Sequence, residues 1–144
     1  IDLSTIASAV TAGHVPEAIR NKLEFEFLAS SEPAIVYGDR NGLEELISNL
    51  IENSILYSEP GGKVVVKIMV EADRTLLTIE DDGCGIPTNE REKVFERAAT
   101  DKPGTGLGLA IVKEIATTHN ATTTVASGAN GKGTSITISF PKNG

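Results

Sequence analysis

The sequence predicts an α+β fold, a two-layer α/β sandwich with about three helices on one face of a mixed sheet of about five or six strands. Two segments, 39–57 and 107–118, place apolar residues at helical spacing and are the clearest helix candidates. The segments that alternate apolar and polar residues follow one another mostly as hairpins. Because hairpins dominate and few strand–helix–strand units occur, the pattern favours the α+β class.

The N-terminal segments begin with a helix. Residues 2–11 have apolar side chains at helical spacing, and either Asp2 or Ser4 can cap the N-terminus of this helix. His14, Val15 and Pro16 then break the pattern.

The next segments combine two short strands with the clearest helix. Residues 23–27 alternate phenylalanine with glutamate, as in a half-buried strand, and residues 34–37 are expected to form a second short strand. The helix over 39–57 is capped by Asp39, and the Pro-Gly-Gly run at 60–62 ends this region.

The remaining elements are two hairpins separated by helices. The expected strands are 63–70, 75–81, 122–126 and 134–140, and the expected helices are 90–98 and 107–118.

Length and composition indicate one domain over residues 1–144. Cys84 is the only cysteine, so an internal disulfide is impossible and a reducing compartment is expected. The longest apolar stretch, 106–112, is far shorter than the ~20 residues of a membrane span. The chain begins without methionine, and we interpret it as part of a longer protein.

The net charge is −7, from 13 basic and 20 acidic residues, without a basic stripe. Nucleic acid is therefore not an expected partner. The 14 glycines are clustered, and the clusters coincide with the segments of chemical interest.

The pair Asn49 and Asn53 lies on one face of the helix over 39–57, at the edge of its apolar stripe. Amide oxygens suit Mg²⁺, which usually keeps several waters and takes few protein ligands. Ordinary surface amides are the alternative interpretation.

A glycine-rich turn, Asp81-Asp82-Gly83-Cys84-Gly85, follows a predicted strand directly. Glycine lets the backbone approach a flat ligand closely, and the carboxylate at the strand end can accept a hydrogen bond from an exocyclic amine. An ordinary strand-terminating turn is the alternative interpretation.

A second glycine-rich segment, Gly104-Thr105-Gly106-Leu107-Gly108-Leu109, begins the helix over 107–118. Exposed backbone N–H groups at a helix N-terminus favour phosphate. The G-x-G-x-G spacing without a preceding strand excludes a Rossmann fingerprint, and Leu109 stands where a P-loop would have lysine.

Together these segments resemble the catalytic and ATP-binding domain of sensor histidine kinases, in the wider ATPase family shared with gyrase, Hsp90 and MutL. Residues 49–58 resemble the N box, 81–86 the G1 box, 94–97 the F box and 104–109 the G2 box. The tail over 131–141 is similar to the closing strand of the family, so the resemblance covers nearly the whole chain.

The resemblance implies the Bergerat fold, with ATP bound between helices and sheet. It implies that Asn53 is the main Mg²⁺ ligand, that Asn49 assists at the metal or phosphates, and that Asp81 accepts a hydrogen bond from the adenine amine. The further nucleotide-binding residues that it implies are Tyr57, Gly83, Gly85, Ile86, Gly104, Thr105, Gly106, Leu107, Gly108, Leu109 and Thr134.

The implied reaction is transfer of the γ-phosphoryl group from ATP to a histidine nitrogen, which depends on positioning and charge neutralisation. Residues 86–104 would form a lid, in which Arg97 joins the two asparagines as a catalytic residue. Lys102 is a further candidate cation for the γ-phosphate. The sequence departs from the family at 98–100 and at Leu56.

Neither histidine of the chain resembles a phosphoacceptor. His14 precedes a helix-breaking proline, and His119 is interpreted as a helix-end cation. The expected partners are therefore the protein's own dimerisation domain, which carries the acceptor histidine, and a cognate response regulator. We expect a monomeric cytoplasmic fragment of a homodimeric protein that is anchored in the bacterial inner membrane.

Three other functions are alternatives to the histidine kinase. ATPases of the gyrase or MutL type and anti-sigma serine kinases carry a glutamate four residues before the Mg²⁺ asparagine, where this sequence has Asn49. A non-catalytic regulatory module that binds nucleotide, or only a partner protein, stays open because of the departure at 98–100.

Overall fold

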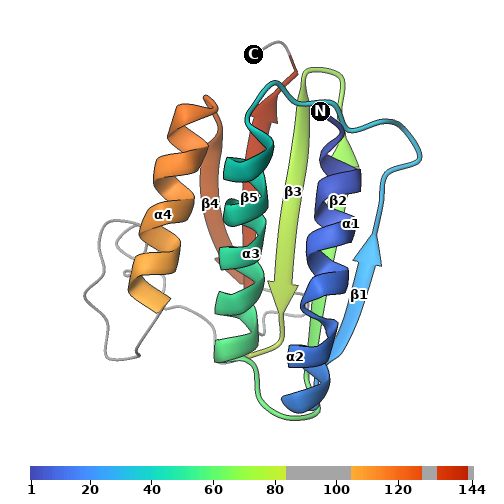
Figure 1. Cartoon of the computed structure of the whole chain (residues 1–144), viewed down its shortest axis with the longest axis vertical. Coiled ribbons are helices and arrows are strands. Elements are labelled where there is room, and N and C mark those ends of the chain that lie inside the picture. The colour runs from blue at the N-terminus through green and yellow to red at the C-terminus, as the bar shows by residue number, and fades with distance from the viewer. Residues whose placement is uncertain (84–104, 128–132, 143–144) are drawn as a thin grey trace.

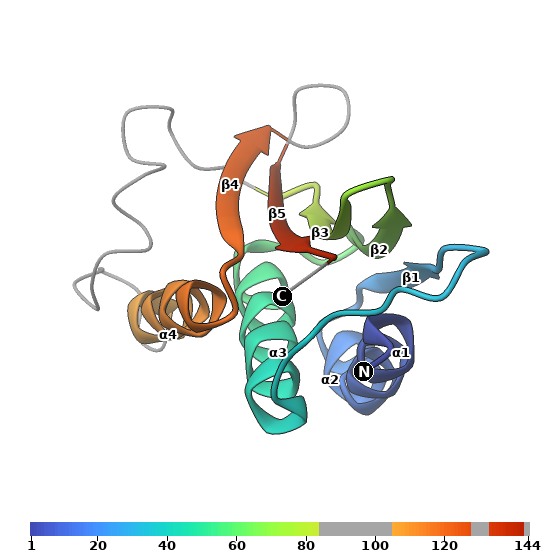
Figure 2. The same cartoon turned by 90° about the horizontal axis from the view of Figure 1, so that it is seen from above.

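The computed structural model describes residues 1–83, 105–127 and 133–142, without the side chains of 105–108. The elements are α1 (Leu3–Gly13), α2 (Val15–Arg20), β1 (Glu24–Leu28), α3 (Arg40–Tyr57), β2 (Lys63–Val70), β3 (Arg74–Asp81), α4 (Thr105–Thr118), β4 (Thr122–Ser127) and β5 (Thr134–Pro141). Figure 1 and Figure 2 show the helices on one face of the sheet, with α3 between α1 and α4.

The sheet has five strands within the described residues, in the order β1-β2-β3-β5-β4. β1 pairs with β2 in parallel, whereas the three other pairs are antiparallel. The predicted mixed sheet in a two-layer α+β fold is therefore confirmed.

The core lies between the two layers. All six apolar residues of the predicted stripe on α3 are buried, and they face the alternate, inward-pointing residues of the strands. The largest fully buried side chains are Phe140, Leu3, Ile6, Leu43, Leu46, Ile47, Leu50, Ile51, Leu77, Ile79, Ile138 and Val36. Burial of this much apolar surface is the dominant favourable contribution to folding.

One N-terminal prediction is wrong, and one helix was not predicted. Residues 34–37 form no strand, because Ile35 makes only an isolated bridge to Asp2 at the chain's N-terminus. The predicted break of the first helix is confirmed, since α1 ends at Gly13, but a second short helix, α2, begins at Val15. Proline is compatible with the first turn of a helix, where its missing N–H has no intrahelical partner to lose. The helix predicted over 90–98 lies outside the described residues.

Asp2 and Asp39 cap α1 and α3 as predicted. The Oδ1 of Asp2 accepts from the N–H of Ser4 at 2.9 Å, and the Oδ2 of Asp39 accepts from the N–H of Gly42 at 2.8 Å. An N-cap of this kind stabilises a helix by about 1 kcal/mol.

His119 joins the end of α4 to the start of α3. Its Nε2 accepts from the backbone N–H of Asp39 at 3.0 Å, and its Nδ1 lies 2.8 Å from the carbonyl of Ile115. An accepting Nε2 carries no proton, so the ring is neutral with its proton on Nδ1. His119 is therefore not the helix-end cation that the sequence suggested.

The ring of His119 also packs closely against its neighbours. Its edge meets Phe140 at a centroid separation of 6.5 Å and an interplanar angle of 82°. A Cβ added to Gly38 would lie only 2.2 Å from the Cδ2 of His119, so glycine is required beside the ring.

No helix among the described residues combines the length and the apolar character that crossing a bilayer would require.

We predict that His119→Ala lowers the free energy of unfolding by about 1–3 kcal/mol, because the Asp39 N–H loses its acceptor and the ring leaves a gap. Urea denaturation measures this change. The control is Thr118→Ala at the preceding exposed position, which is expected to change stability by less than about 0.5 kcal/mol. Equal effects of the two substitutions would contradict the role given to the ring.

Candidate functional site

The predicted site residues gather at one end of the molecule. The C-terminal ends of α3 and β3 and the N-terminal ends of α4 and β5 all lie at the lower end in Figure 1. Segments that are far apart in the sequence and carry predicted site residues therefore meet at one end of the described structure.

Asp81, the last residue of β3, is buried with 6% of its surface exposed. Its Oδ1 accepts from the N–H of Gly83 at 2.9 Å. The side chain of Ser54 and the backbone of Thr134 also favour the charged form of this carboxylate. Residues of α3, of β5 and of the turn after β3 therefore all act on one acidic group.

The pKa of Asp81 is raised above its ordinary value, chiefly because burial disfavours the charged form. The hydrogen bonds from Gly83, Ser54 and Thr134 oppose this shift, and the charge of Asp82 adds to it. Perturbed carboxyl groups of this kind are concentrated at functional sites.

Two glycines bring the backbone close around Asp81. Gly133 has φ of +72°, and a Cβ added there would lie 1.9 Å from the carbonyl oxygen of Asp81. A Cβ on Gly83 would lie 2.2 Å from the carbonyl oxygen of Tyr57, at the end of α3. The site therefore depends on contacts that only glycine permits. The structural need for Gly133 was not predicted from the sequence.

Asn53 faces the same region from α3. It is buried, with 5% exposed, and its Oδ1 has no hydrogen-bond partner within the described part of the chain. A buried polar atom without a partner is costly and rare, and at such a position it points to a ligand. Asn49, one turn earlier, is half-buried.

The other predicted residues divide into three groups. Thr134 is buried opposite Asp81 in the β3–β5 pair, and Tyr57 is half-buried at the end of α3. Thr105, Gly106, Leu107 and Gly108 form the first turn of α4, whereas Leu109 is 3% exposed and belongs to the core. Gly85, Ile86, Arg97, Lys102 and Gly104 lie outside the described residues.

The first turn of α4 is suited to an anion. The first four N–H groups of a helix have no intrahelical acceptor, and the helix dipole adds positive potential there. The burial of Leu109 anchors this turn to the core.

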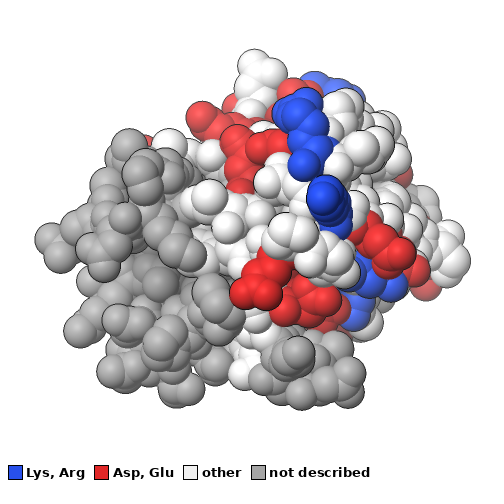
Figure 3. All heavy atoms as spheres, turned by 90° about the horizontal axis from the view of Figure 1, so that it is seen from below, with Lys and Arg blue, Asp and Glu red and all other residues white. Residues whose placement is uncertain are grey.

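Carboxylates and histidines do not form a metal site in the described residues, which contain no suitable group of three His, Cys, Asp or Glu. On the face seen in Figure 3, basic side chains are bordered by acidic ones.

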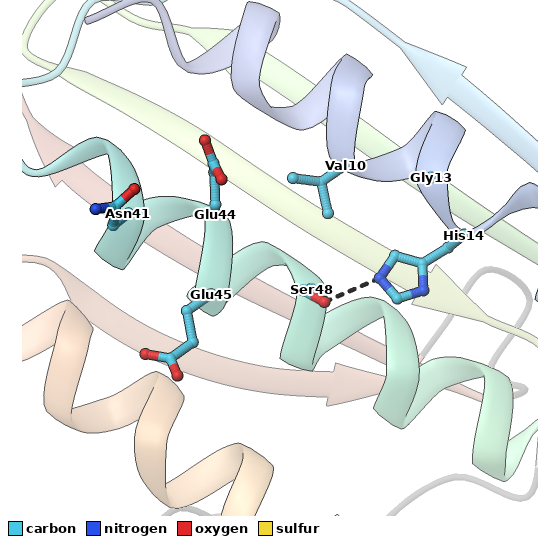
Figure 4. Close-up of a pocket in the computed structure, with 7 residues that line it drawn as sticks. All are labelled: Val10, Gly13, His14, Asn41, Glu44, Glu45 and Ser48. Carbon is cyan, nitrogen blue, oxygen red and sulfur yellow. Dashed lines mark hydrogen bonds between the residues drawn. The ribbon is translucent and has the colours of Figure 1, made fainter.

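A separate groove lies between α1 and the N-terminal half of α3, with a volume of about 460 Å³. Figure 4 shows His14 pointing toward Ser48, with 2.9 Å between Nε2 and Oγ. The Nδ1 of His14 lies 3.1 Å from an oxygen of Glu17. These contacts join the C-terminal end of α1 and the start of α2 to the middle of α3.

The model of the histidine kinase-, DNA gyrase B- and HSP90-like ATPase family matches residues 38–144. The chain is 37% identical over 131 residues to the signal transduction histidine-protein kinase/phosphatase MprB of Mycolicibacterium vanbaalenii, covering 85% of this chain and 27% of that protein. It is 34% identical over 146 residues to the sensor histidine kinase RppB of Synechocystis sp., covering 96% of this chain and 32% of that protein. The chain thus spans about a quarter to a third of these relatives.

Comparison with solved structures also gives sensor histidine kinases as similar proteins. A mycobacterial sensor histidine kinase MprB superposes with a TM-score of 0.85 and 34% identity, covering 98% of this chain and 95% of that chain. The Bergerat fold implied by the motifs is confirmed.

We predict that Gly133→Ala destabilises the protein more than Gly61→Ala does. Both glycines have positive φ, +72° and +89°, but the Cβ added at Gly61 meets no atom within 4 Å. The left-handed backbone costs about 1–2 kcal/mol in each variant, and the collision with Asp81 adds at least about 1 kcal/mol at position 133. Equal losses in urea denaturation would contradict the predicted contact.

We predict that Asp81→Asn leaves the ligand-free protein at least as stable as the wild type at neutral pH. A pKa raised on folding means that the folded state binds more protons than the unfolded state between the two pKa values, so stability falls as pH rises through this range. The amide removes this cost. The advantage of the variant, measured by thermal unfolding at several pH values, should be greatest at neutral pH and vanish toward about pH 3. A lower Tm of the variant at neutral pH would contradict the prediction.

Proposed function

The chain belongs to the histidine kinase-, DNA gyrase B- and HSP90-like ATPase family, and on this premise we propose that it is the ATP-binding kinase domain of a sensor histidine kinase. In the proposed reaction, the γ-phosphoryl group of Mg²⁺-bound ATP moves to a histidine on a separate dimerisation domain. The observation that carries this proposal is that buried Asp81 and the Oδ1 of Asn53, which has no partner in the described part of the chain, lie at the same end as the N-terminus of α4.

Asp81 would select the base. An ionised carboxylate only accepts hydrogen bonds, so it pairs with the 6-amino group of adenine and opposes the 6-oxo group of guanine. The close backbone approaches at Gly83 and Gly133 keep this carboxylate in place, and Thr134 lies beside it in β5.

Asn53 would hold the cation, with Asn49 assisting one helical turn away. The unpartnered Oδ1 of Asn53 has the chemistry of a Mg²⁺ ligand, because that ion prefers oxygen donors and takes few from the protein. When bound, Mg²⁺ neutralises charge on the phosphates. The N–H groups at the start of α4 would bind phosphate oxygens, and Arg97 and Lys102 of the lid over 86–104 would add positive charge.

Phosphoryl transfer is favoured over hydrolysis because position 49 carries an amide. An amide cannot take a proton from attacking water, as a glutamate can. Neither histidine of the chain is placed to accept the phosphoryl group. His119 lies at the opposite end of α4 from its glycine-rich first turn, and His14 lies in the groove between α1 and α3. A separate dimerisation domain would therefore supply the acceptor, and a response regulator would receive the phosphoryl group.

A non-catalytic nucleotide-binding module is the second candidate. The departure of residues 98–100 from the family pattern favours it. The whole protein is proposed to be a homodimer anchored in the inner membrane in either case.

The decisive experiment measures ATP binding with and without Mg²⁺, and then phosphoryl transfer to the protein's own dimerisation domain supplied in trans. We expect Mg²⁺-dependent binding and an acid-labile, base-stable phosphate on that domain. Tight binding without such a phosphate would favour the non-catalytic module, and no binding would overturn both candidates.

We predict that Asn53→Ala weakens Mg²⁺-dependent ATP binding at least about tenfold and abolishes transfer, because the buried oxygen ligand is lost. Isothermal titration calorimetry measures the binding. Asn41→Ala, at an exposed position on the same helix, is the matched control and is expected to bind like the wild type. Unchanged affinity of Asn53→Ala would refute the metal assignment.

A further inference from the structure

We propose that Asp82 is a positioning residue for base recognition: its carboxylate fastens the turn over 81–83 to the start of β2 and so holds the Asp81 carboxylate in place for the adenine amine. This inference rests on the proposed nucleotide-binding function. Asp82 was not among the residues predicted from the sequence to act in the site.

Asp82 lies beside the site without entering it. Side chains alternate between the two faces of a strand, and at the end of β3 Asp81 is buried whereas Asp82 is exposed. Asp82 lies one position beyond the last pair of the β2–β3 ladder, Val64 with Asp81. A positional effect of Asp82 on the base therefore passes through the backbone that it shares with Asp81.

The Asp82 carboxylate is bonded to the neighbouring strand. Its Oδ1 accepts from the backbone N–H of Lys63, the first residue of β2, at 3.1 Å. The same oxygen lies over Gly62, where an added Cβ would be only 2.6 Å away. The hydrogen bond extends the β2–β3 pairing by one position and ties the turn to a strand that also pairs with β1.

Backbone from α3 and from the segment before β5 also lies close to the turn. A Cβ added to Gly83 would be 2.2 Å from the carbonyl oxygen of Tyr57, and one added to Gly133 would be 2.6 Å from the Cα of Asp82. These contacts limit how near the neighbours come, whereas the bond to β2 supplies an attraction. Because the N–H of Gly83 donates to the Oδ1 of Asp81 at 2.9 Å, a shift of the turn would move that carboxylate as well.

The charge of Asp82 acts in the opposite direction to its hydrogen bond. That charge raises the pKa of Asp81, so its removal alone favours the ionised carboxylate. An ionised carboxylate only accepts hydrogen bonds and therefore prefers a 6-amino to a 6-oxo purine. Loss of the hydrogen bond instead displaces the acceptor and weakens this preference. The sign of the change in base preference therefore separates the two effects.

The test measures dissociation constants of Mg²⁺-ATP and of Mg²⁺-bound inosine triphosphate (ITP) for the 144-residue chain and its variants. For Asp82→Ala we expect about threefold to tenfold weaker ATP binding and at least about a twofold lower ATP/ITP preference. Asp82→Asn, which keeps a carbonyl acceptor without the charge, should retain at least the wild-type preference. Asp73→Ala is the matched control, an exposed aspartate in the turn between β2 and β3 that should bind both nucleotides like the wild type.

A second measurement tests the contact without nucleotide. Hydrogen exchange of the Lys63 amide, followed by NMR, should be faster in Asp82→Ala than in the wild type, because the N–H loses its acceptor. The rate in Asp82→Asn should stay close to that of the wild type.

A wild-type ATP/ITP preference or a wild-type Lys63 exchange rate in Asp82→Ala would overturn the role of Asp82 while leaving the proposed function intact. An equal loss of preference in Asp82→Asn would also overturn it, since that variant keeps the acceptor. Failure of the wild type to bind ATP would overturn both the inference and the proposed function. If Asp82→Ala does not fold, Asp82→Ser carries the test, because serine suits turns but its oxygen is one bond shorter in reach. It should show a reduced preference, and an unchanged preference would overturn the inference.

Discussion

Asp81 is buried where the helical layer meets the sheet, and its charge requires hydrogen-bond donors because water is largely excluded. The N–H of Gly83 in the turn after β3 donates to it, and groups at the start of β5 and the end of α3 also favour its charged form. Each donor constrains the segment that carries it. The close approaches of Gly83 to Tyr57 and of Gly133 to Asp81 follow from bringing these segments together around one carboxylate. The geometry of this end of the molecule therefore depends on the stabilisation of one acidic group.

This arrangement costs stability in the absence of ligand. Asp81 has a raised pKa, and the Oδ1 of Asn53 is buried without a hydrogen-bond partner among the residues that the structure describes. Both features disfavour the ligand-free folded state, and both suit a molecule that brings an amine and a cation. The domain tolerates these costs because burial of its apolar core, centred on α3, contributes a larger favourable free energy of folding.

The fold was largely predictable because its strongest elements have clear periodicity. The six apolar residues of α3 and the alternation in β2, β3 and β5 determine which faces are buried. The strand predicted over 34–37 is wrong because an alternating pattern indicates which side chains are buried but not whether the segment pairs with a sheet. Ile35 instead forms a bridge to Asp2, near the chain's N-terminus. Helix α2 was missed because proline was interpreted as a break and not as the first turn of a new helix.

The site was predictable only in part. Motif spacing predicted Asn53 and Asp81 as site residues, whereas the close approach of Gly133 to Asp81 depends on how β5 meets the end of β3. The neutral state of His119 likewise depends on a backbone N–H that lies 80 residues away in the chain. Such long-range contacts leave no local pattern in a single sequence.

Helix α3 determines the spacing of the residues that it carries. His119 and the Asp39 cap secure its N-terminal end, and the approach of Gly83 to Tyr57 secures its C-terminal end. Asn49, Asn53 and Ser54 therefore lie along one helix that is held at both ends, with a rise of about 1.5 Å per residue. The separation of Asn49 and Asn53, the two proposed Mg²⁺ ligands, is therefore set by helical pitch and not by loop conformation. Movement of neighbouring loops can therefore change access to these residues without changing their spacing along the helix.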